Sequence, residues 1–293
     1  MARHVLTGEE LTHEELSALL ERALELKAGR SSGEGADGLA RKSVALVFEK
    51  PSTRTRVSFE VGVAELGGTP LILRGDELQL SRGESVADTA RVLSRYVQAI
   101  VVRAGSHVVV AELADAAEVP VINGLTPDHH PCQALADLLT LHERFGSLEG
   151  LRVAYVGDGN NVARSLGIVG RTAGIELRVA SPEGYRIEPG LATLDTDDPR
   201  EAAADADAVY TDVWVSMGDE ADAQRRRADL APFQVNDELL ASASERAIVL
   251  HCLPAHPGEE ITEDVLYGER SAVWDQAENR LHAQKALLEL LVP

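Results

Sequence analysis

The residues best suited to chemistry lie in one short stretch, FEKPSTRTRVSFE, which runs from Phe48 to Glu60. An apolar run leads into this stretch, and Pro51 ends any strand there because proline has no N–H to donate to a sheet. Apolar residues then recur at helical spacing. The hydroxyl and guanidinium groups of residues 52–56 therefore lie where a strand turns into a helix.

Such a helix N-terminus offers free backbone N–H groups and a partial positive charge, and both favour an anion. The planar guanidinium group of arginine adds paired donors that match phosphate oxygens. Arg54 and Arg56 supply two such groups. The stretch therefore predicts a site for a small ligand that carries a phosphate group. The simpler alternative is a Ser/Thr helix cap with solvated arginines.

A second candidate site surrounds Asp212, in the segment TDVWVSMGDE. A lone carboxylate after a strand is commonly a helix cap. Here the turn that begins at Ser216 and Met217 would add backbone N–H groups and a hydroxyl group. The carboxylate suits an ammonium group, the turn suits a carboxylate, and Asn161 can both donate and accept. These features together predict a site for an α-amino acid.

The two cysteines both lie in polar motifs, Cys132 in HHPCQ and Cys252 in HCLPAH. A disulfide between them is not expected in a cytoplasmic chain. We interpret the thiols as site residues, and buried packing is the alternative.

Nucleotide and metal sites have weaker support. The loop GDGNN resembles a dinucleotide-binding loop, but Val162 stands where the third glycine should be. Six histidine and cysteine side chains could bind a metal ion, at spacings that match no common zinc pattern. They are His129, His130, Cys132, His251, Cys252 and His256.

Composition limits the possible partners. The net charge of −20 argues against nucleic acid, which the surface would repel. No apolar run has the length of a membrane span, and the N-terminus lacks the apolar segment of a signal peptide. We therefore expect a cytoplasmic protein with neither nucleic acid nor membrane as a partner.

The 293 residues are enough for two domains of ordinary size. Short apolar strands alternate with helical segments, and their near-continuous apolar character favours parallel strands covered on both faces. The predicted class is α/β: two domains, each with a central, mostly parallel sheet flanked by helices, joined by two interdomain helices. We expect one domain at 1–146, with a C-terminal helix at 277–293 packing back on it, and the other at 147–276. The predicted strands are Val44–Phe48, Pro70–Leu73, Ala99–Val102, Pro120–Ile122, Arg152–Val156, Glu176–Ala180, Ala208–Tyr210, Ala247–Leu250 and Ala272–Trp274.

Six polar motifs directly follow predicted strands or come soon after them. In open α/β sheets, ligands bind beyond the carboxyl ends of the strands. The motifs therefore predict one cleft between the two domains. They are Arg103, Asn123, HHPCQ, GDGNN, Asp212 and the pair His251-Cys252.

Seven motifs together give the chain, from Leu11 to Leu290, a clear resemblance to the ornithine carbamoyltransferases of the aspartate/ornithine carbamoyltransferase superfamily. S-T-R-T-R and H-P-x-Q are typical of carbamoyltransferases in general, whereas D-x-W-x-S-M-G with H-C-L-P is typical of the ornithine branch. The motifs are FEKPSTRTRVSFE, RGES with DTARVLSRY, HPCQALADLL, VGDGNNV, TDVWVSMG, HCLPAH and AENRLHAQKAL.

The resemblance implies transfer of a carbamoyl group from carbamoyl phosphate to the δ-amine of L-ornithine, which gives citrulline in arginine metabolism. It implies that no metal or organic cofactor is needed. It also implies a homotrimer or a multiple of trimers, in which Gln79 reaches the neighbouring subunit's site. The catalytic residues would be Arg54, Arg103, His130 and Cys252. Carbamoyl phosphate would contact Ser52, Thr53, Arg54, Thr55, Gln79, Arg103, His130, Pro131, Cys132, Gln133, Cys252, Leu253 and Arg280. Ornithine would contact Asn161, Asp212, Ser216 and Met217.

Two departures from the family pattern stand out. The segment from Tyr185 to Asp197 is shorter than expected, as if one helix were missing, and Pro257 replaces a residue that is often basic. Other acceptors considered are putrescine, an acylated ornithine and aspartate, and a catalytically silent ligand-binding homologue is a further alternative. Aspartate would require extra cations for its second carboxylate, and putrescine would leave the donors at 216–217 unpaired.

Overall fold

The computed structural model describes residues 2–32, 36–78, 83–215 and 220–292. The chain forms two compact units. Unit 1 consists of Met1–Leu139 with Asn279–Pro293, and unit 2 of Thr140–Glu278. The division falls inside two helices, α5 (Pro131–Phe145) and α11 (Val273–Leu291).

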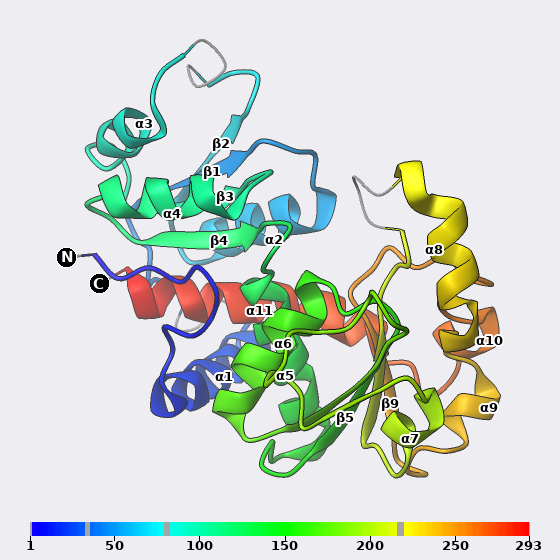
Figure 1. The fold of residues 1–293 in the computed structure, drawn as a ribbon. Helices are drawn as coiled ribbons and strands as arrows, with labels where there is room; N and C mark the ends of the chain where they lie inside the picture. Colours follow the sequence, from blue (N-terminus) through cyan, green and yellow to red (C-terminus); the bar gives the residue numbers. More distant parts are fainter. Residues whose placement is uncertain (1, 33–35, 79–82, 216–219, 293) are drawn as a thin grey trace. The chain divides into compact units, whose positions relative to one another are not determined.

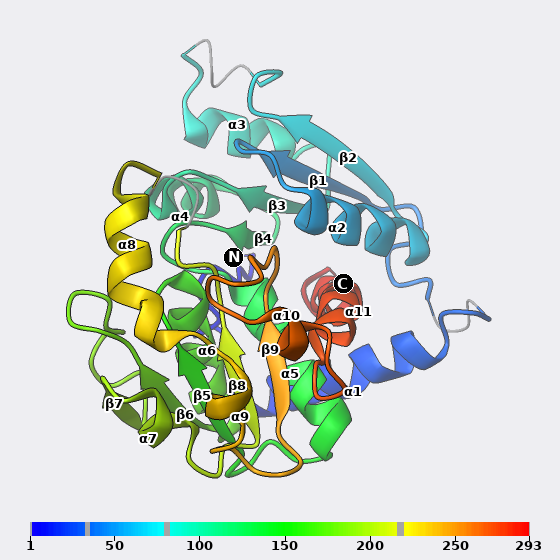
Figure 2. The same cartoon turned by 90° about the vertical axis from the view of Figure 1, so that its right-hand side faces the viewer.

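Unit 1 contains a four-stranded sheet in the order β2-β1-β3-β4, and all of its strand pairs are parallel. Figures 1 and 2 show these strands side by side. β1, β3 and β4 consist almost entirely of buried residues, as a covered parallel sheet requires. The strands are β1 (Ser43–Phe48), β2 (Thr69–Arg74), β3 (Ala99–Arg103) and β4 (Val121–Leu125).

Four helices of unit 1 connect or precede these strands. They are α1 (His13–Ala28), α2 (Thr53–Glu65), α3 (Val86–Leu93) and α4 (His107–Ala116). Thr12 caps α1 together with Glu15, whose side chain accepts from the Thr12 backbone N–H, so the two residues form a capping box.

The C-terminal part of α11 packs on α1 and α2. The Lys27 ammonium donates to the side chain of Asn279 over 2.9 Å. Lys285, which is 1% exposed, forms an ion pair with Glu65 at 2.9 Å. A Cβ atom at Gly62 of α2 would lie 3.2 Å from Cγ of Lys285, so a glycine there permits the close approach of α11.

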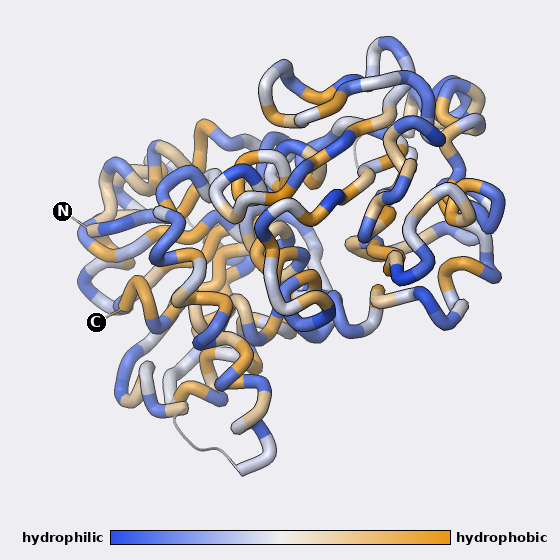
Figure 3. The backbone as a smooth tube through the Cα atoms, turned by 90° about the horizontal axis from the view of Figure 1, so that it is seen from below, coloured by the Kyte–Doolittle hydropathy of each residue, from blue (hydrophilic) through white to orange (hydrophobic). Residues whose placement is uncertain are grey.

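Unit 2 contains a five-stranded sheet in the order β7-β6-β5-β8-β9, again with parallel pairs only. Its strands are β5 (Arg152–Val156), β6 (Glu176–Ala180), β7 (Leu194–Thr196), β8 (Ala208–Thr211) and β9 (Ile248–His251). Its helices include α6 (Asn161–Ala173), α7 (Pro199–Ala203), α8 (Ala223–Leu230), α9 (Asp237–Leu240) and α10 (Glu263–Leu266). The predicted α/β class with two parallel sheets is confirmed. Figure 3 shows how apolar and polar segments alternate along the chain, as this architecture requires.

Two details of the predicted strands are wrong. Ala272–Trp274 is not a strand, because α11 already begins at Val273 and only Ser271 forms an isolated bridge to β9. The three-residue apolar run is too short for its periodicity to distinguish a strand from a helix start. The edge strand β7 was not predicted, because it spans only Leu194–Thr196 and has a single buried residue.

The short segment before β7 packs as a loop against α6. Within the described part of unit 2, no helix lies between β6 and β7. The Gly159 N–H donates to the Tyr185 carbonyl over 2.8 Å. A Cβ atom at Gly167 would lie 2.8 Å from the Leu191 carbonyl oxygen, so these glycines let the loop approach closely. The loop therefore lies where the family resemblance implied a missing helix.

Candidate active site

The phosphate-type motif lies at the predicted turn from strand to helix. β1 ends at Phe48, and α2 begins at Thr53. Ser52 occupies the N-cap position with an extended backbone, but its side chain makes no capping hydrogen bond. The simple helix-cap interpretation therefore does not explain its hydroxyl group. Arg54 is exposed, whereas Thr55 is only 2% exposed.

Three guanidinium groups gather in unit 1. Arg103, the last residue of β3, is 8% exposed, and its Nε atom is buried without a hydrogen-bond partner among the described residues. Burial lowers the pKa of Arg103, and the neighbouring charges of Arg280 and Arg54 lower it further. In the part of the chain that the structure describes, no carboxylate forms an ion pair with Arg54 or Arg103. Two arginines with no carboxylate partner in that part of the chain, held beside a third, favour an anionic ligand.

His130 lies against the same cations and is buried. Burial lowers the pKa of its ring well below the usual value, and the charges of Arg280, Arg103 and Arg54 act in the same direction. A guanidinium group can only donate, so the contact of 3.3 Å from Arg280 Nη1 makes Nε2 of His130 the acceptor. The neutral ring then carries its proton on Nδ1 and can act as a hydrogen-bond donor without being charged.

Arg280 is held by polar groups from two further helices. Its Nη2 atom donates to the Thr55 hydroxyl over 2.7 Å, and its Nη1 atom donates to Oε1 of Gln133. Gln133 in turn donates to Oδ1 of Asp137 over 2.8 Å. Asp137 is fully buried, and sequence reasoning did not identify it. The spacing of four residues between Gln133 and Asp137 on one helix is the signal that could have identified it.

Two other motif residues have structural partners. Pro131 is the first residue of α5. The Cys132 thiol is fully buried and donates to the Asn123 carbonyl over 3.4 Å, and burial raises its pKa to about 12. Asn123 lies inside β4 rather than after it, and its side chain donates to the Leu6 carbonyl over 2.8 Å. These contacts favour packing roles for both side chains.

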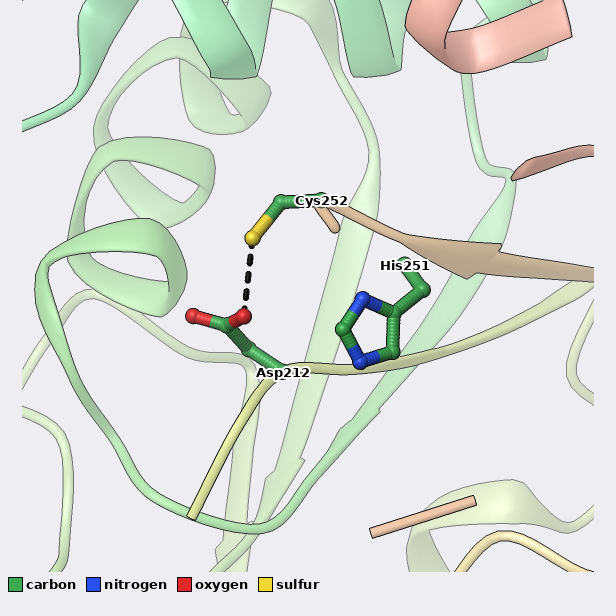
Figure 4. Close-up of side chains that lie close together, drawn as sticks. All are labelled: Asp212, His251 and Cys252. Carbon is green, nitrogen blue, oxygen red and sulfur yellow. Dashed lines mark hydrogen bonds between the residues drawn. The ribbon is translucent and has the colours of Figure 1, made fainter. Parts of the chain in front are cut away.

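The amino-acid motif in unit 2 brings a carboxylate and a thiol together. Asp212 directly follows β8 and is 6% exposed. Its Oδ1 atom accepts from the Cys252 thiol over 2.8 Å, as Figure 4 shows, and its Oδ2 atom accepts from Asn160 over 2.7 Å. No lysine or arginine among the described residues forms an ion pair with this carboxylate. A buried carboxylate that has only neutral donors suits an ammonium group.

Hydrogen bonds of the His251 ring stabilise the turn that carries Cys252. The Leu253 N–H donates to Nδ1 of His251 over 2.9 Å, so the ring proton lies on Nε2. Nε2 then donates to Oε1 of the fully buried Glu260 over 3.0 Å. Leu253 has a φ of 57°, a left-handed conformation that costs a leucine about 1–2 kcal/mol. The His251 contact stabilises this turn.

Metal binding can be assessed from the same contacts. The ligand atoms of Asp212, His251 and Cys252 lie within 4.8 Å of one another. Both ring nitrogens of His251 already have partners, so a metal ion on this residue would displace Leu253 or Glu260. The geometry therefore explains the cluster without a metal ion.

Of the other residues predicted to bind a substrate, only some lie in the described part of the chain. Asn161 is the first residue of α6 and is half-buried, next to the Asn160 that holds Asp212. Gln79, Ser216 and Met217 lie outside the described residues. The structure thus brings Arg54, Arg103, His130 and Arg280 together in unit 1, and Asp212 and Cys252 together in unit 2. A cleft shared by the two units stays a prediction.

These features define a class of protein: a two-unit α/β chain with an anion-binding set of guanidinium groups and a separate carboxylate–thiol pair suited to an amine. Residues 3–143 match the aspartate/ornithine carbamoyltransferase carbamoyl-P binding domain. Residues 149–291 match the Asp/Orn binding domain of the same family. The chain belongs to the aspartate/ornithine carbamoyltransferase family.

Individual relatives are similar over their full lengths. The chain is 54% identical over 305 residues to the ornithine carbamoyltransferase of Acidothermus cellulolyticus, covering 100% of this chain and 97% of that protein. The ornithine carbamoyltransferase structure from Pyrococcus furiosus has a TM-score of 0.94 and 50% identity, over 99% of this chain and 97% of that one. The structure from Thermus thermophilus has a TM-score of 0.92 and 46% identity, over 100% of both chains. Among the described residues, no helix has both the length and the apolar character of a membrane span.

Proposed function

We propose that this protein transfers the carbamoyl group of carbamoyl phosphate to the δ-amine of L-ornithine. The nitrogen lone pair attacks the carbamoyl carbon, the bond from that carbon to the phosphate oxygen breaks, and citrulline, phosphate and a proton result. The observation that carries this proposal is identity of about half of all residues, over the whole chain, to proteins named ornithine carbamoyltransferase.

Carbamoyl phosphate is assigned to the domain 1–146 with the returning helix 277–293. The clustered guanidinium groups of Arg54, Arg103 and Arg280 support this, because three neighbouring positive charges match a dianionic phosphate. The phosphate group is assigned to residues 52–55 at the N-terminus of α2, with Arg280. There the free backbone N–H groups add their partial positive charge. These cations also stabilise the phosphate as it leaves.

The carbamoyl oxygen becomes an oxyanion during attack and requires donors. The candidates are Arg103, the Nδ1–H group of neutral His130 and the Thr55 hydroxyl. A single well-placed donor lowers the barrier by about 3 kcal/mol. A neutral imidazole suits this task, because it donates without adding a further positive charge beside three arginines.

Ornithine is assigned to the domain 147–276. Asp212 is proposed to bind the α-ammonium group, and Asn161, Ser216 and Met217 the rest of the amino-acid group. Cys252 and the Leu253 carbonyl are proposed to lie near the attacking δ-amine. A free alkyl amine has a pKa of about 10.4, so only about one molecule in two thousand is neutral at pH 7. A cationic and partly dry pocket lowers that pKa and raises the reactive fraction.

The test is citrulline formation from carbamoyl phosphate with ornithine as the acceptor, run beside aspartate, putrescine and an acylated ornithine. We expect turnover with ornithine and at most traces with the other three. Preferential turnover of another acceptor, or none with any of them, contradicts the proposal.

We also propose a homotrimer or a multiple of trimers, with Gln79 reaching into the neighbouring subunit's site. Family membership supports this assembly. Light scattering coupled to gel filtration measures the mass directly, and a monomeric mass at working concentration contradicts it.

A further inference from the structure

Asn160 makes contacts that a simple helix cap does not need. Its Oδ1 atom accepts from the backbone N–H groups of Val162 and Ala163, at 2.9 and 3.3 Å, and so caps α6. The same oxygen accepts from the hydroxyl of the fully buried Tyr155 at 3.1 Å. These three donors fix which way the amide faces, because an NH₂ group cannot accept any of them.

The NH₂ group of this amide therefore faces Asp212. Nδ2 of Asn160 donates to Oδ2 of Asp212 over 2.7 Å, while the Cys252 thiol donates to Oδ1 over 2.8 Å. Both carboxylate oxygens are thus engaged, and the plane of the carboxylate is set by two donors on two different elements. Neither donor is charged, so the negative charge of Asp212 stays available for a ligand.

The backbone around this contact is held firmly as well. The Thr211 hydroxyl donates to the Val156 carbonyl over 2.7 Å and so joins the ends of β8 and β5. Gly157 has a φ of 129°, and a Cβ atom there would lie 3.4 Å from the Thr211 hydroxyl. The positive φ favours glycine at this position, where the loop that carries Asn160 leaves β5.

We propose that Asn160 is a positioning residue for ornithine: it orients the Asp212 carboxylate toward the ammonium group while it caps α6. The inference rests on the proposed function, in which Asp212 binds the α-ammonium group of ornithine. Asn160 itself does not contact the reacting atoms. Its loss should affect the use of ornithine and leave the use of carbamoyl phosphate largely unchanged.

The experiment separates the cap from the contact with Asp212. Asp and Ser cap helices about as well as Asn. Asn160→Ser therefore keeps the cap and removes the donor to Asp212, while Asn160→Asp keeps the cap and replaces the donor by a second carboxylate. The matched control is Asn236→Asp: Asn236 caps α9 in the same unit by accepting from the Leu239 N–H over 3.0 Å, and among the described residues it makes no hydrogen bond to Asp212.

We expect both Asn160 variants to fold, since the cap is kept, but to unfold a few degrees below the wild type, because Asn160→Ser removes the acceptor of the Tyr155 hydroxyl and Asn160→Asp adds a carboxylate beside Asp212. Each should lose about tenfold to a hundredfold in kcat/KM for ornithine, the effect of removing one hydrogen bond to a charged group. Asn160→Asp should lose more, because two adjacent carboxylates repel and must share a proton. The KM for carbamoyl phosphate should stay within about twofold, and Asn236→Asp should match the wild type.

Two results overturn the inference. One is a wild-type kcat/KM for ornithine in both folded Asn160 variants. The other is an equal loss for both substrates that follows the fall in unfolding temperature, which would make Asn160 a structural cap only. A wild-type protein that forms no citrulline contradicts the proposed function instead. In that case calorimetric titration with ornithine decides on Asn160: binding by wild type that both variants weaken supports its role, and any other result overturns it.

Discussion

At the scale of single residues, the charge state of His130 decides what its side chain can do. Burial comes first, and the adjacent guanidinium groups add to it, so the pKa of the ring lies well below its usual range. A protonated imidazole here would repel three cations, whereas the neutral ring can still donate through Nδ1. The residue is therefore suited to polarising a carbonyl group and unsuited to supplying a proton.

This pKa has a consequence for stability. The unfolded chain binds a proton at this histidine near pH 6.5, while the folded chain does so only at a lower pH. His130 therefore favours the folded state above pH 6.5, and this contribution is lost as the pH falls toward the folded pKa. Below pH 6.5 the unfolding free energy of the wild type should therefore fall with decreasing pH. In His130→Asn it should fall less steeply, by up to about 1.4 kcal/mol per pH unit. Urea unfolding between pH 7.5 and 5.5 measures this, and parallel slopes in the two proteins would contradict it.

Arg54 is the most accessible arginine of the cluster, so its role can be tested without loss of the fold. We expect Arg54→Ala to abolish turnover, because it removes a paired phosphate donor, while the unfolding temperature stays close to that of the wild type. Steady-state citrulline assays and thermal unfolding measure both effects.

The control for this variant is Arg56→Ala, two residues further on in α2. Arg56 is paired with Glu60 at 3.7 Å, so its charge already has a partner on the same helix. Arg56→Ala should retain most of the activity. Retained turnover in Arg54→Ala would remove Arg54 from the phosphate site.

At the scale of elements, α11 supplies Arg280 to the cluster and must be held in place. Lys285 does this through Glu65 of α2, in a pair whose lysine is buried. Arg30 contacts the same carboxylate at 3.0 Å from a more exposed position. One carboxylate therefore carries a buried and an exposed cation, which makes the two contributions directly comparable.

We expect Lys285→Met to lower the unfolding free energy by about 3 kcal/mol, since it leaves a partly buried carboxylate without its inner partner. Arg30→Met should cost less than about 1 kcal/mol, as exposed ion pairs do. Chemical denaturation of both variants measures the difference. Equal costs would show that burial of Lys285 does not strengthen the pair.

Much at this scale can be predicted from the sequence, because the signals are local. Helical spacing and Pro51 predict the turn into α2, and apolar runs predict eight of the strands. The contacts between site residues are harder to predict from the sequence, because the residues in contact lie far apart in the chain. Asn160 and Asp212 are 52 positions apart, and Arg280 and His130 are 150 apart. Only the packed sheets bring such residues together, so no local pattern predicted the contact between Asn160 and Asp212.

At the scale of the whole molecule, the chain carries a net charge of −20 although one of its sites is suited to an anion. The cations at that site lie close together and partly buried, so short-range interactions outweigh the distant acidic surface, which salt screens. The proposed transfer brings the amine of ornithine to the carbamoyl group beside these cations, and a cationic surrounding disfavours a protonated amine.

The reaction should therefore depend on pH through the amine of ornithine. The neutral fraction of a free alkyl amine rises about tenfold per pH unit below its pKa of about 10.4. We expect kcat/KM for ornithine to rise from pH 7 toward pH 9. A flat profile over this range, with the chemical step limiting the rate, would contradict control by amine deprotonation.

The central claim is that a new bond forms between the carbamoyl carbon and the δ-nitrogen of ornithine. The most direct measurement uses carbamoyl phosphate labelled with ¹³C and ornithine labelled with ¹⁵N at the δ position, followed by NMR in the presence of the protein. We predict a carbamoyl ¹³C signal split by one-bond coupling to ¹⁵N, appearing together with free phosphate. A ¹³C signal that never couples to the δ-nitrogen, while carbamoyl phosphate only decays at its spontaneous rate, would contradict the account.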